Sequence, residues 1–126
     1  MSTKAQLIGI APQLRVPDVV KTAEYYINVL GFRLIGYFLD PPVYAMVERD
    51  GFQIHFGKIN GNAAVHTNKV PGSEVTDFVI WVPEIELFYA EVKAAGANII
   101  QDIIHRSYGR EFLISDCDGH VIMVGD

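Results

Sequence analysis

Two stretches of the chain place apolar side chains at every third or fourth position. They cover residues 19–30 and 85–95, and a glycine follows each of them. This spacing is typical of amphipathic helices, and a glycine directly after the stripe favours the left-handed conformation that ends a helix. We predict that Asp18 caps the first helix and that Pro83 lies in the first turn of the second.

The segments around these helices alternate apolar and polar residues, which is typical of strands. In the first half, Asp50-Gly51 is a strong signal for a tight hairpin turn. The predicted strands cover residues 8–16, 33–38, 43–49, 52–58, 75–82, 98–104, 110–115 and 120–124. Each half of the chain therefore has the order β-α-β-β-β.

The two halves also share short motifs. Val16-Pro17-Asp18 corresponds to Val82-Pro83-Glu84, and Asp50-Gly51-Phe52 corresponds to Asp118-Gly119-His120. A repeat longer than sixty residues is too long for a solenoid, so we infer a duplicated module whose copies pair around a shared concavity.

The length of 126 residues predicts one domain, because modules of about sixty residues bury too little surface to be comfortably stable alone. We expect a single domain over residues 1–126, with a first module at about 5–58, a linker at 59–73 and a second module at about 74–126.

Composition narrows the class of protein. Hydrophobic residues make up 50% and charged residues 20%, and no apolar run approaches the roughly twenty residues that span a bilayer. The net charge of −5, without a dense basic cluster, argues against nucleic acid as a partner. The N-terminus lacks the apolar core of a secretory signal and Cys117 is the only cysteine, so we expect a cytoplasmic protein.

Successive side chains of a strand point to opposite faces. In strand 52–58 the apolar side chains alternate with the others, so we expect the apolar ones to pack under the helix and the others to lie on the opposite face. If two-residue turns close both hairpins, Met46 pairs with His55 and Phe112 pairs with Gly125. The residues predicted to face the concavity and bind a ligand are Gln13, Arg15, Tyr44, Met46, His55, Asp77, Trp81, Phe112 and Met123. Such a mostly apolar wall with a few polar groups suits an organic ligand, although it could also fill a closed barrel or a subunit interface.

The repeated β-α-β-β-β order and three further motifs resemble one superfamily. The motifs are Val29-Leu30-Gly31-Phe32, the run 108–112, and the turn 116–120. Together they resemble the glyoxalase, bleomycin-resistance and extradiol-dioxygenase (vicinal oxygen chelate) superfamily, and most of all its bleomycin-resistance-like branch. The resemblance implies an α+β fold in which two βαβββ modules form an incomplete β-barrel around a shared cleft. It leaves the function open, because the superfamily holds metal-dependent enzymes and metal-free binding proteins.

In enzymatic members, the resemblance places the metal ligands at positions that correspond here to Ala11, His55, Asp77 and Met123. Alanine has no donor atom, and a thioether is a poor ligand for divalent ions of this kind. The other two positions fall short of the three protein ligands usual at a catalytic site. We therefore expect no metal cofactor.

Our preferred interpretation is a metal-independent homodimer that binds a mid-sized, possibly antibiotic-like ligand in the aromatic cleft. We assign no catalytic residues. The alternative is a lyase, isomerase or dioxygenase that uses Zn, Mn, Ni or Fe on His55 and Asp77, with a third ligand from Gln53, Glu48 or a partner chain. A third interpretation is that the surfaces through which two copies pair are the whole function of the protein. His55 could also serve as a base oriented by Asp77.

We expect structural roles for the residues around the lone cysteine. Cys117 lies between Asp116 and Asp118, whose negative charges should raise the pKa of the thiol and keep it unreactive. The two aspartates belong to a predicted turn before the last strand, where carboxylates commonly accept backbone hydrogen bonds.

Overall fold

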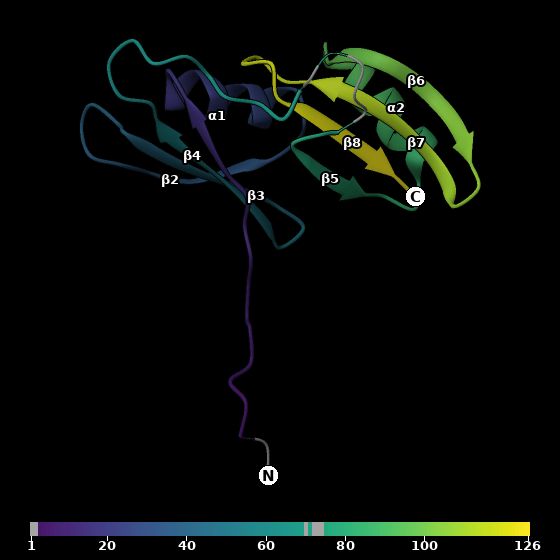
Figure 1. Cartoon of the computed structure of the whole chain (residues 1–126), viewed down its shortest axis with the longest axis horizontal. Coiled ribbons are helices and arrows are strands. Elements are labelled where there is room, and N and C mark those ends of the chain that lie inside the picture. Colours follow the sequence, from purple (N-terminus) through teal and green to yellow (C-terminus); the bar gives the residue numbers. More distant parts are fainter. Residues whose placement is uncertain (1–2, 70, 72–74) are drawn as a thin grey trace.

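The computed structural model describes residues 3–69, 71 and 75–126, and it contains two sheets and two helices (Figure 1). Residues 70 and 72–74, around the end of the predicted linker, lie outside the described part. The elements are β1 (Gln13–Val16), α1 (Val19–Asn28), β2 (Arg33–Phe38), β3 (Tyr44–Arg49), β4 (Phe52–Lys58), β5 (Phe78–Trp81), α2 (Ile85–Ala94), β6 (Asn98–Arg106), β7 (Gly109–Ser115) and β8 (Val121–Gly125). Within these residues, no helix is both long and apolar enough to cross a bilayer.

The two halves have the same topology. The first sheet has the strand order β1-β4-β3-β2 and the second has the order β5-β8-β7-β6. In each sheet the first pair of strands is parallel and the other pairs are antiparallel. The predicted duplication and the α+β fold class are therefore confirmed, and the two sheets stay separate rather than closing into a barrel.

The first helix begins where the sequence predicts. The Asp18 side chain accepts hydrogen bonds from the backbone N–H groups of Val20 and Lys21, both at 3.1 Å. These bonds satisfy two of the donors that the first turn leaves without a partner inside the helix. The helix α1 is followed by Gly31 with φ of 75°, a left-handed conformation that glycine adopts at little cost.

The second helix begins later than predicted. Glu84 is the N-cap of α2, so Pro83 precedes the helix and does not lie in its first turn. The Val82 N–H donates to the Gly125 carbonyl at 2.8 Å, which continues the pairing of β5 with β8 past the end of the strand. Glu84 itself has non-helical backbone angles, with φ of −88° and ψ of 62°, so the first helical residue is Ile85.

The core lies between each helix and its sheet. Tyr26 of α1 is fully buried and packs on Phe56 of β4, with ring centroids 4.8 Å apart. On the same strand Ile54 is 4% exposed, whereas Phe52 next to the hairpin turn is 76% exposed. The prediction that alternate residues of this strand pack under the helix is thus correct for its middle and wrong at its first residue.

The first hairpin has the predicted register. Asp50 and Gly51 both have positive φ, as a two-residue turn of this type requires. Met46 consequently pairs with His55.

The second hairpin does not have the predicted register. Its turn spans residues 116–120, so Phe112 pairs with Val124 rather than with Gly125. The shift by one residue turns Phe112 to the other face, because side chains alternate along a strand. Phe112 is fully buried under α2, with its ring 5.1 Å from that of Tyr89. The prediction that it faces the concavity is therefore wrong.

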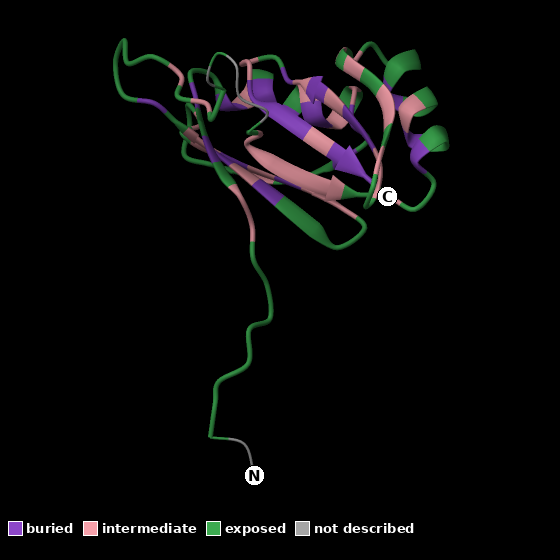
Figure 2. Ribbon diagram, turned by 45° about the vertical axis from the view of Figure 1, so that its right-hand side comes forward, coloured by how far each residue is buried: buried purple, intermediate pink, exposed green. Residues whose placement is uncertain are grey.

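The predicted first strand is also too long, since β1 begins only at Gln13. The preceding residues form an extended segment that stands away from the rest of the protein (Figure 1). Its apolar side chains are exposed, at 87% for Leu7, 98% for Ile8 and 93% for Ile10 (Figure 2). We call residues 3–10 the N-terminal arm.

Candidate functional site

A cavity of about 580 Å³ lies between the two modules, and we call it the intermodule cleft. Its walls come from the start of β4, from the edge strand β5 and from the first turn of α2. The lining residues are Ile10, Pro12, Phe32, Arg49, Asp50, Phe52, Gln53, Ile54, Phe78, Val79, Ile80, Trp81, Val82, Pro83, Glu84, Leu87, Phe88 and Glu91. This volume lies within the range of small-molecule sites.

Besides Ile10 of the N-terminal arm, three large apolar side chains line the cleft and remain exposed. Phe52 follows the hairpin turn, Trp81 ends an edge strand, and Leu87 lies outside the buried stripe of α2. Their exposed fractions are 76%, 73% and 69%. Leu87 is the residue that the sequence could have revealed, since an apolar side chain outside a buried stripe is unpartnered within its own fold.

Carboxylates outnumber cations at the cleft. Asp50, Glu84 and Glu91 line it, together with the single guanidinium of Arg49. Glu91 neutralises that guanidinium through two contacts, at 2.7 and 3.2 Å. The remaining charge at the cleft is therefore negative.

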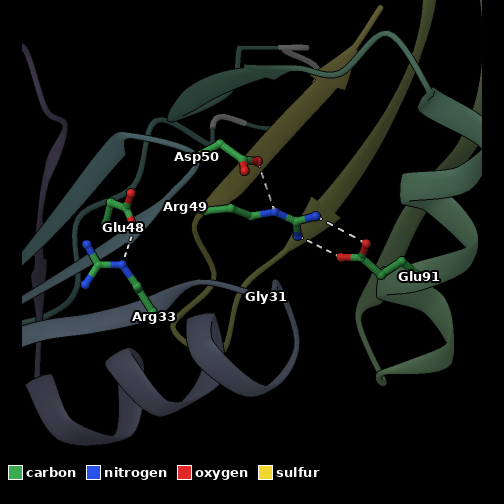
Figure 3. Close-up of a pocket in the computed structure, with 6 residues that line it drawn as sticks. All are labelled: Gly31, Arg33, Glu48, Arg49, Asp50 and Glu91. Atoms are coloured by element: carbon green, nitrogen blue, oxygen red, sulfur yellow. Dashed lines mark hydrogen bonds and ion pairs between the residues drawn. The ribbon is translucent and has the colours of Figure 1, made fainter.

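Arg49 connects the end of α1 with α2 (Figure 3). Besides the contacts with Glu91, its Nη1 donates to the Leu30 carbonyl at 2.7 Å, and its guanidinium lies 5.0 Å from the centroid of the Phe88 ring. The hydrogen bond with Glu91 raises the pKa of Arg49. A Cβ at Gly31 would lie only 2.6 Å from Nη1, so a side chain there would displace the Arg49 guanidinium, in addition to the strain of the positive φ. These contacts give Arg49 a structural role in joining the modules.

A chain of polar side chains crosses the face of the first sheet that lies opposite α1 and ends at the cleft. Gln13 donates to the Tyr44 hydroxyl at 2.6 Å, and this hydroxyl is 2.8 Å from Nδ1 of His55. The other ring nitrogen, Nε2, lies 2.8 Å from the side-chain oxygen of Gln53, a residue that lines the cleft. One tautomer satisfies the whole chain, with the hydroxyl donating to Nδ1 and Nε2–H donating to Gln53.

Asp77 does not orient His55. Its Oδ1 accepts from the Asn68 backbone N–H at 2.7 Å, and its Oδ2 accepts from the Val121 backbone N–H at 2.8 Å. The carboxylate therefore holds the residues that lead into β5 next to the start of β8. The suggestion of a His55–Asp77 pair is wrong, because His55 contacts side chains of the first module, whereas Asp77 contacts the linker and the second module.

The residues at the family's metal positions do not fit a divalent ion. Ala11 and Met123 lack suitable donors, both nitrogens of His55 have partners, and both oxygens of Asp77 accept backbone hydrogen bonds. Among the described residues, the one group of three metal-ligating side chains within 4.8 Å is Asp116, Asp118 and His120, and it includes none of these positions.

The remaining residues predicted to bind a ligand are distributed over several places. Trp81 lines the cleft, whereas Gln13, Arg15, Tyr44, Met46, His55, Asp77, Phe112 and Met123 do not. Arg15 donates to the Lys58 carbonyl at 3.3 Å on the face of the first sheet that lies opposite α1. The structure thus brings Gln13, Tyr44 and His55 together, and Gln53 connects them to the cleft.

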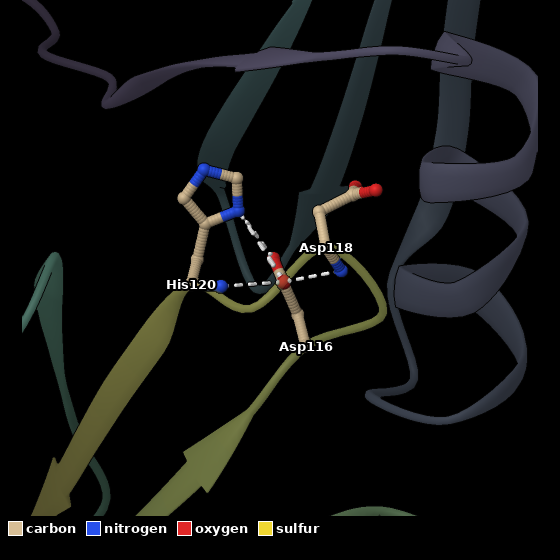
Figure 4. A group of neighbouring side chains, drawn as sticks. All are labelled: Asp116, Asp118 and His120. Atoms are coloured by element: carbon tan, nitrogen blue, oxygen red, sulfur yellow. Dashed lines mark hydrogen bonds and ion pairs between the residues drawn. The ribbon is translucent and has the colours of Figure 1, made fainter. Parts of the chain in front are cut away.

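The group around Asp116 is a folded turn (Figure 4). The Asp116 carboxylate accepts from the Tyr26 hydroxyl at 2.7 Å and from the backbone N–H groups of Asp118 and His120 at 2.9 Å each. Nδ1 of His120 lies 3.0 Å away from it. The Asp118 carboxylate accepts from Thr22 of α1. Because these bonds occupy the carboxylate oxygens, the group stabilises the β7–β8 connection as predicted for a turn.

The Asp116–His120 pair predicts a pH dependence of stability. Burial opposes protonation of His120, but the hydrogen bond and charge of Asp116 raise its pKa, so its stabilisation is complete below about pH 6.5 and is lost as the pH rises through the folded pKa. Burial likewise opposes ionisation of Asp116, yet hydrogen bonds from His120 and Tyr26 lower its pKa, and this contribution is lost in acid. We expect the melting temperature, measured by circular dichroism, to fall as the pH is raised above about 6.5. An equal fall in His120→Asn would contradict this assignment.

Cys117 behaves as the sequence predicts. Partial burial and the charges of Asp118 and Asp116 raise the pKa of its thiol to about 12. A thiol with this pKa is almost fully protonated at neutral pH and is a poor nucleophile.

The fold and the cleft define a class of α+β protein in which two βαβββ modules with open sheets are joined in one chain. A family model described as the Glyoxalase/Bleomycin resistance protein/Dioxygenase superfamily matches residues 10–124. The chain belongs to this superfamily, as its motifs predict.

Solved structures of similar fold include proteins of different kinds. TioX from Micromonospora sp. ML1 is 20% identical, with a TM-score of 0.74 over 93% of this chain and 96% of TioX. A glyoxalase-related enzyme from Clostridium phytofermentans is 18% identical, with a TM-score of 0.75 over 98% of both chains. The bleomycin-binding protein from Streptomyces verticillus, complexed with copper(II)-bleomycin, is 18% identical, with a TM-score of 0.70 over 96% of this chain and 97% of that one. Such identities show the fold alone, and no curated protein matches the chain.

Proposed function

We propose that the protein binds a mid-sized organic cation with an aromatic part in the intermodule cleft, and that it does so without a metal ion. The observation that carries this proposal is the exposed apolar wall of Phe52, Trp81 and Leu87 beside an excess of carboxylates. Aromatic faces attract cations, and a negative rim raises their local concentration.

Two further observations support the proposal. The bleomycin-binding protein of similar fold holds an organic ligand. The donor chemistry at Ala11, His55, Asp77 and Met123 argues against the metal-dependent alternative. We also propose a cytoplasmic homodimer, because exposed apolar side chains favour pairing and a lone cysteine suits a reducing compartment.

The test is a thermal-shift and fluorescence screen with aromatic cations and, as a contrasting set, hydrophobic acids. A ligand present at a hundredfold excess over its Kd should stabilise the fold by about 2.7 kcal/mol, which raises Tm by roughly 10 °C for a chain of this length. Trp81 is the only tryptophan, so a bound aromatic cation should also change its emission. If neither set raises Tm, or if only the acids do, the proposal is wrong.

A pair of variants tests whether the ligand binds in the cleft. Trp81→Ala should weaken binding at least about tenfold, equivalent to about 1.4 kcal/mol. The matched control is Phe38→Ala, since Phe38 is an exposed aromatic residue on β2 that does not line the cleft. Calorimetric titration with manganese, nickel, zinc and iron(II) should give no stoichiometric micromolar binding. Such binding, lost in His55→Ala, would instead support the metal-dependent alternative.

A further inference from the structure

The side-chain amide of Gln53 has a direction that the hydrogen bonds behind it determine. Gln53 is exposed and lines the intermodule cleft, and its side-chain oxygen lies 2.8 Å from Nε2 of His55. A glutamine amide carries its acceptor oxygen and its NH₂ donor on two separate branches. Because the oxygen accepts from His55, the NH₂ group is the branch that is left for the cleft.

The imidazole of His55 offers a proton to Gln53 because its other nitrogen is held as an acceptor. Gln13 donates to the Tyr44 hydroxyl at 2.6 Å, and this hydroxyl lies 2.8 Å from Nδ1 of His55. With the opposite tautomer, Nδ1–H would point at an oxygen that already accepts a hydrogen bond, and the hydroxyl proton would have no acceptor. Each group thus fixes the orientation of the next, from Gln13 to Gln53.

The NH₂ group of Gln53 is available to a ligand. The residue opposite it on β3 is Glu48, whose Oε1 accepts from the Gly51 backbone N–H at 2.8 Å and whose Oε2 lies 2.6 Å from Nε of Arg33. Among the residues that the structure describes, none accepts a hydrogen bond from this NH₂ group. A molecule that enters the cleft therefore meets a donor whose direction is already fixed.

We propose that Gln53 makes the cleft select aromatic cations that also carry a hydrogen-bond acceptor, such as a ketone or amide oxygen. Gln13, Tyr44 and His55 are positioning residues, because they fix the direction of the Gln53 amide without lining the cleft themselves. A ligand without an acceptor would cover the NH₂ group without replacing its hydrogen bond to water, which weakens binding. This inference rests on the proposed function and adds a second recognition element to it.

The chain of hydrogen bonds can be tested without any ligand. In NMR spectra of the imidazole nitrogens, His55 is assigned by the signals that are lost in His55→Gln. These signals should show an unprotonated Nδ1 and a proton on Nε2 that exchanges slowly with solvent. The slow exchange should be lost in Gln53→Leu and kept in Tyr37→Phe, which alters a tyrosine of β2 outside this chain of hydrogen bonds. A proton on Nδ1, or exchange that Gln53→Leu leaves unchanged, would overturn the inference.

A matched pair of cations tests the selectivity. Phenacyltrimethylammonium has a ketone where phenethyltrimethylammonium has a methylene group, and the two are otherwise alike. In calorimetric titrations, the unmodified protein should bind the ketone about fivefold more tightly, as one additional hydrogen bond predicts. Gln53→Glu keeps an acceptor for His55 but has no NH₂ group, so it should abolish this preference. Tyr44→Phe should reduce the preference, and Tyr37→Phe should retain it.

Failure of this inference can be distinguished from failure of the proposed function. If the two cations bind the unmodified protein with equal affinity, or if Gln53→Glu keeps the preference for the ketone, the inference is wrong and the proposed function stands. If no aromatic cation binds, the proposed function is wrong and the inference is overturned with it.

Discussion

Replacing Phe112 by alanine is expected to lower the free energy of unfolding by about 3–5 kcal/mol. The ring is fully buried beneath α2 and packs against Phe88 and Tyr89, with centroids 6.4 and 5.1 Å away. Removing it deletes apolar contacts and leaves a cavity that the rigid sheet fills only in part. Urea unfolding at pH 7, followed by circular dichroism, measures the change.

Leu113→Ala is the matched control, because Leu113 is the next residue of β7 and faces the other side of the sheet. Leu113 pairs with Met123 and is only half-buried, so the loss of stability should be about half of that for Phe112→Ala, or less. A larger loss for Leu113 than for Phe112 would mean that the register of β7 is shifted by one residue.

The first module could be predicted closely because its chemistry is local. Asp50-Gly51 permits only a short turn, and this fixes every pair of the β3–β4 hairpin. Gln13, Tyr44 and His55 therefore share one face, as counting by twos along each strand predicts. The Asp18 cap is equally local, because the two backbone N–H groups that donate to its side chain lie only two and three residues further along the chain.

The second hairpin could not be predicted in the same way. Asp118-Gly119 looks like a two-residue turn, but the buried Asp116 carboxylate accepts bonds from the backbone of residues 118 and 120 and from Tyr26 of the other module. These contacts hold a turn of five residues where two were predicted, and this odd difference shifts the pairing by one residue and reverses the face of Phe112. The decisive partner, Tyr26, lies 90 residues away in the sequence.

The candidate site combines predictable and unpredictable parts. Trp81 could be assigned to the concave side from its strand alone. The cleft itself depends on how the start of β4 approaches β5 and α2, and this brings in Phe52 and Leu87. Alternation along a strand says nothing about the distance between two modules. The Arg49 contacts that join them depend on a long side chain reaching Glu91 and Leu30.

Asp116→Ala is expected to destabilise the fold by about 3–5 kcal/mol at pH 6, as breaking a buried charged pair does. The Asp116 side chain is completely buried, and its removal leaves the Tyr26 hydroxyl, two backbone N–H groups and the His120 ring without their acceptor. Unsatisfied buried donors lose their hydrogen bonds to water without replacement. Thermal and urea unfolding of the variant measure the loss.

Asp118→Ala is the control for this prediction, because it removes a carboxylate from the same turn. Asp118 accepts from Thr22 and the Cys117 thiol and is less buried than Asp116, so the loss should stay near about 1 kcal/mol. Asp116→Asn keeps the shape but replaces one acceptor oxygen by an NH₂ group that faces donors, and its stability should lie between those of the other two variants. Equal losses for Asp116→Ala and Asp118→Ala would show that the turn, rather than the hydrogen bonds of Asp116, determines the stability of the β7–β8 connection.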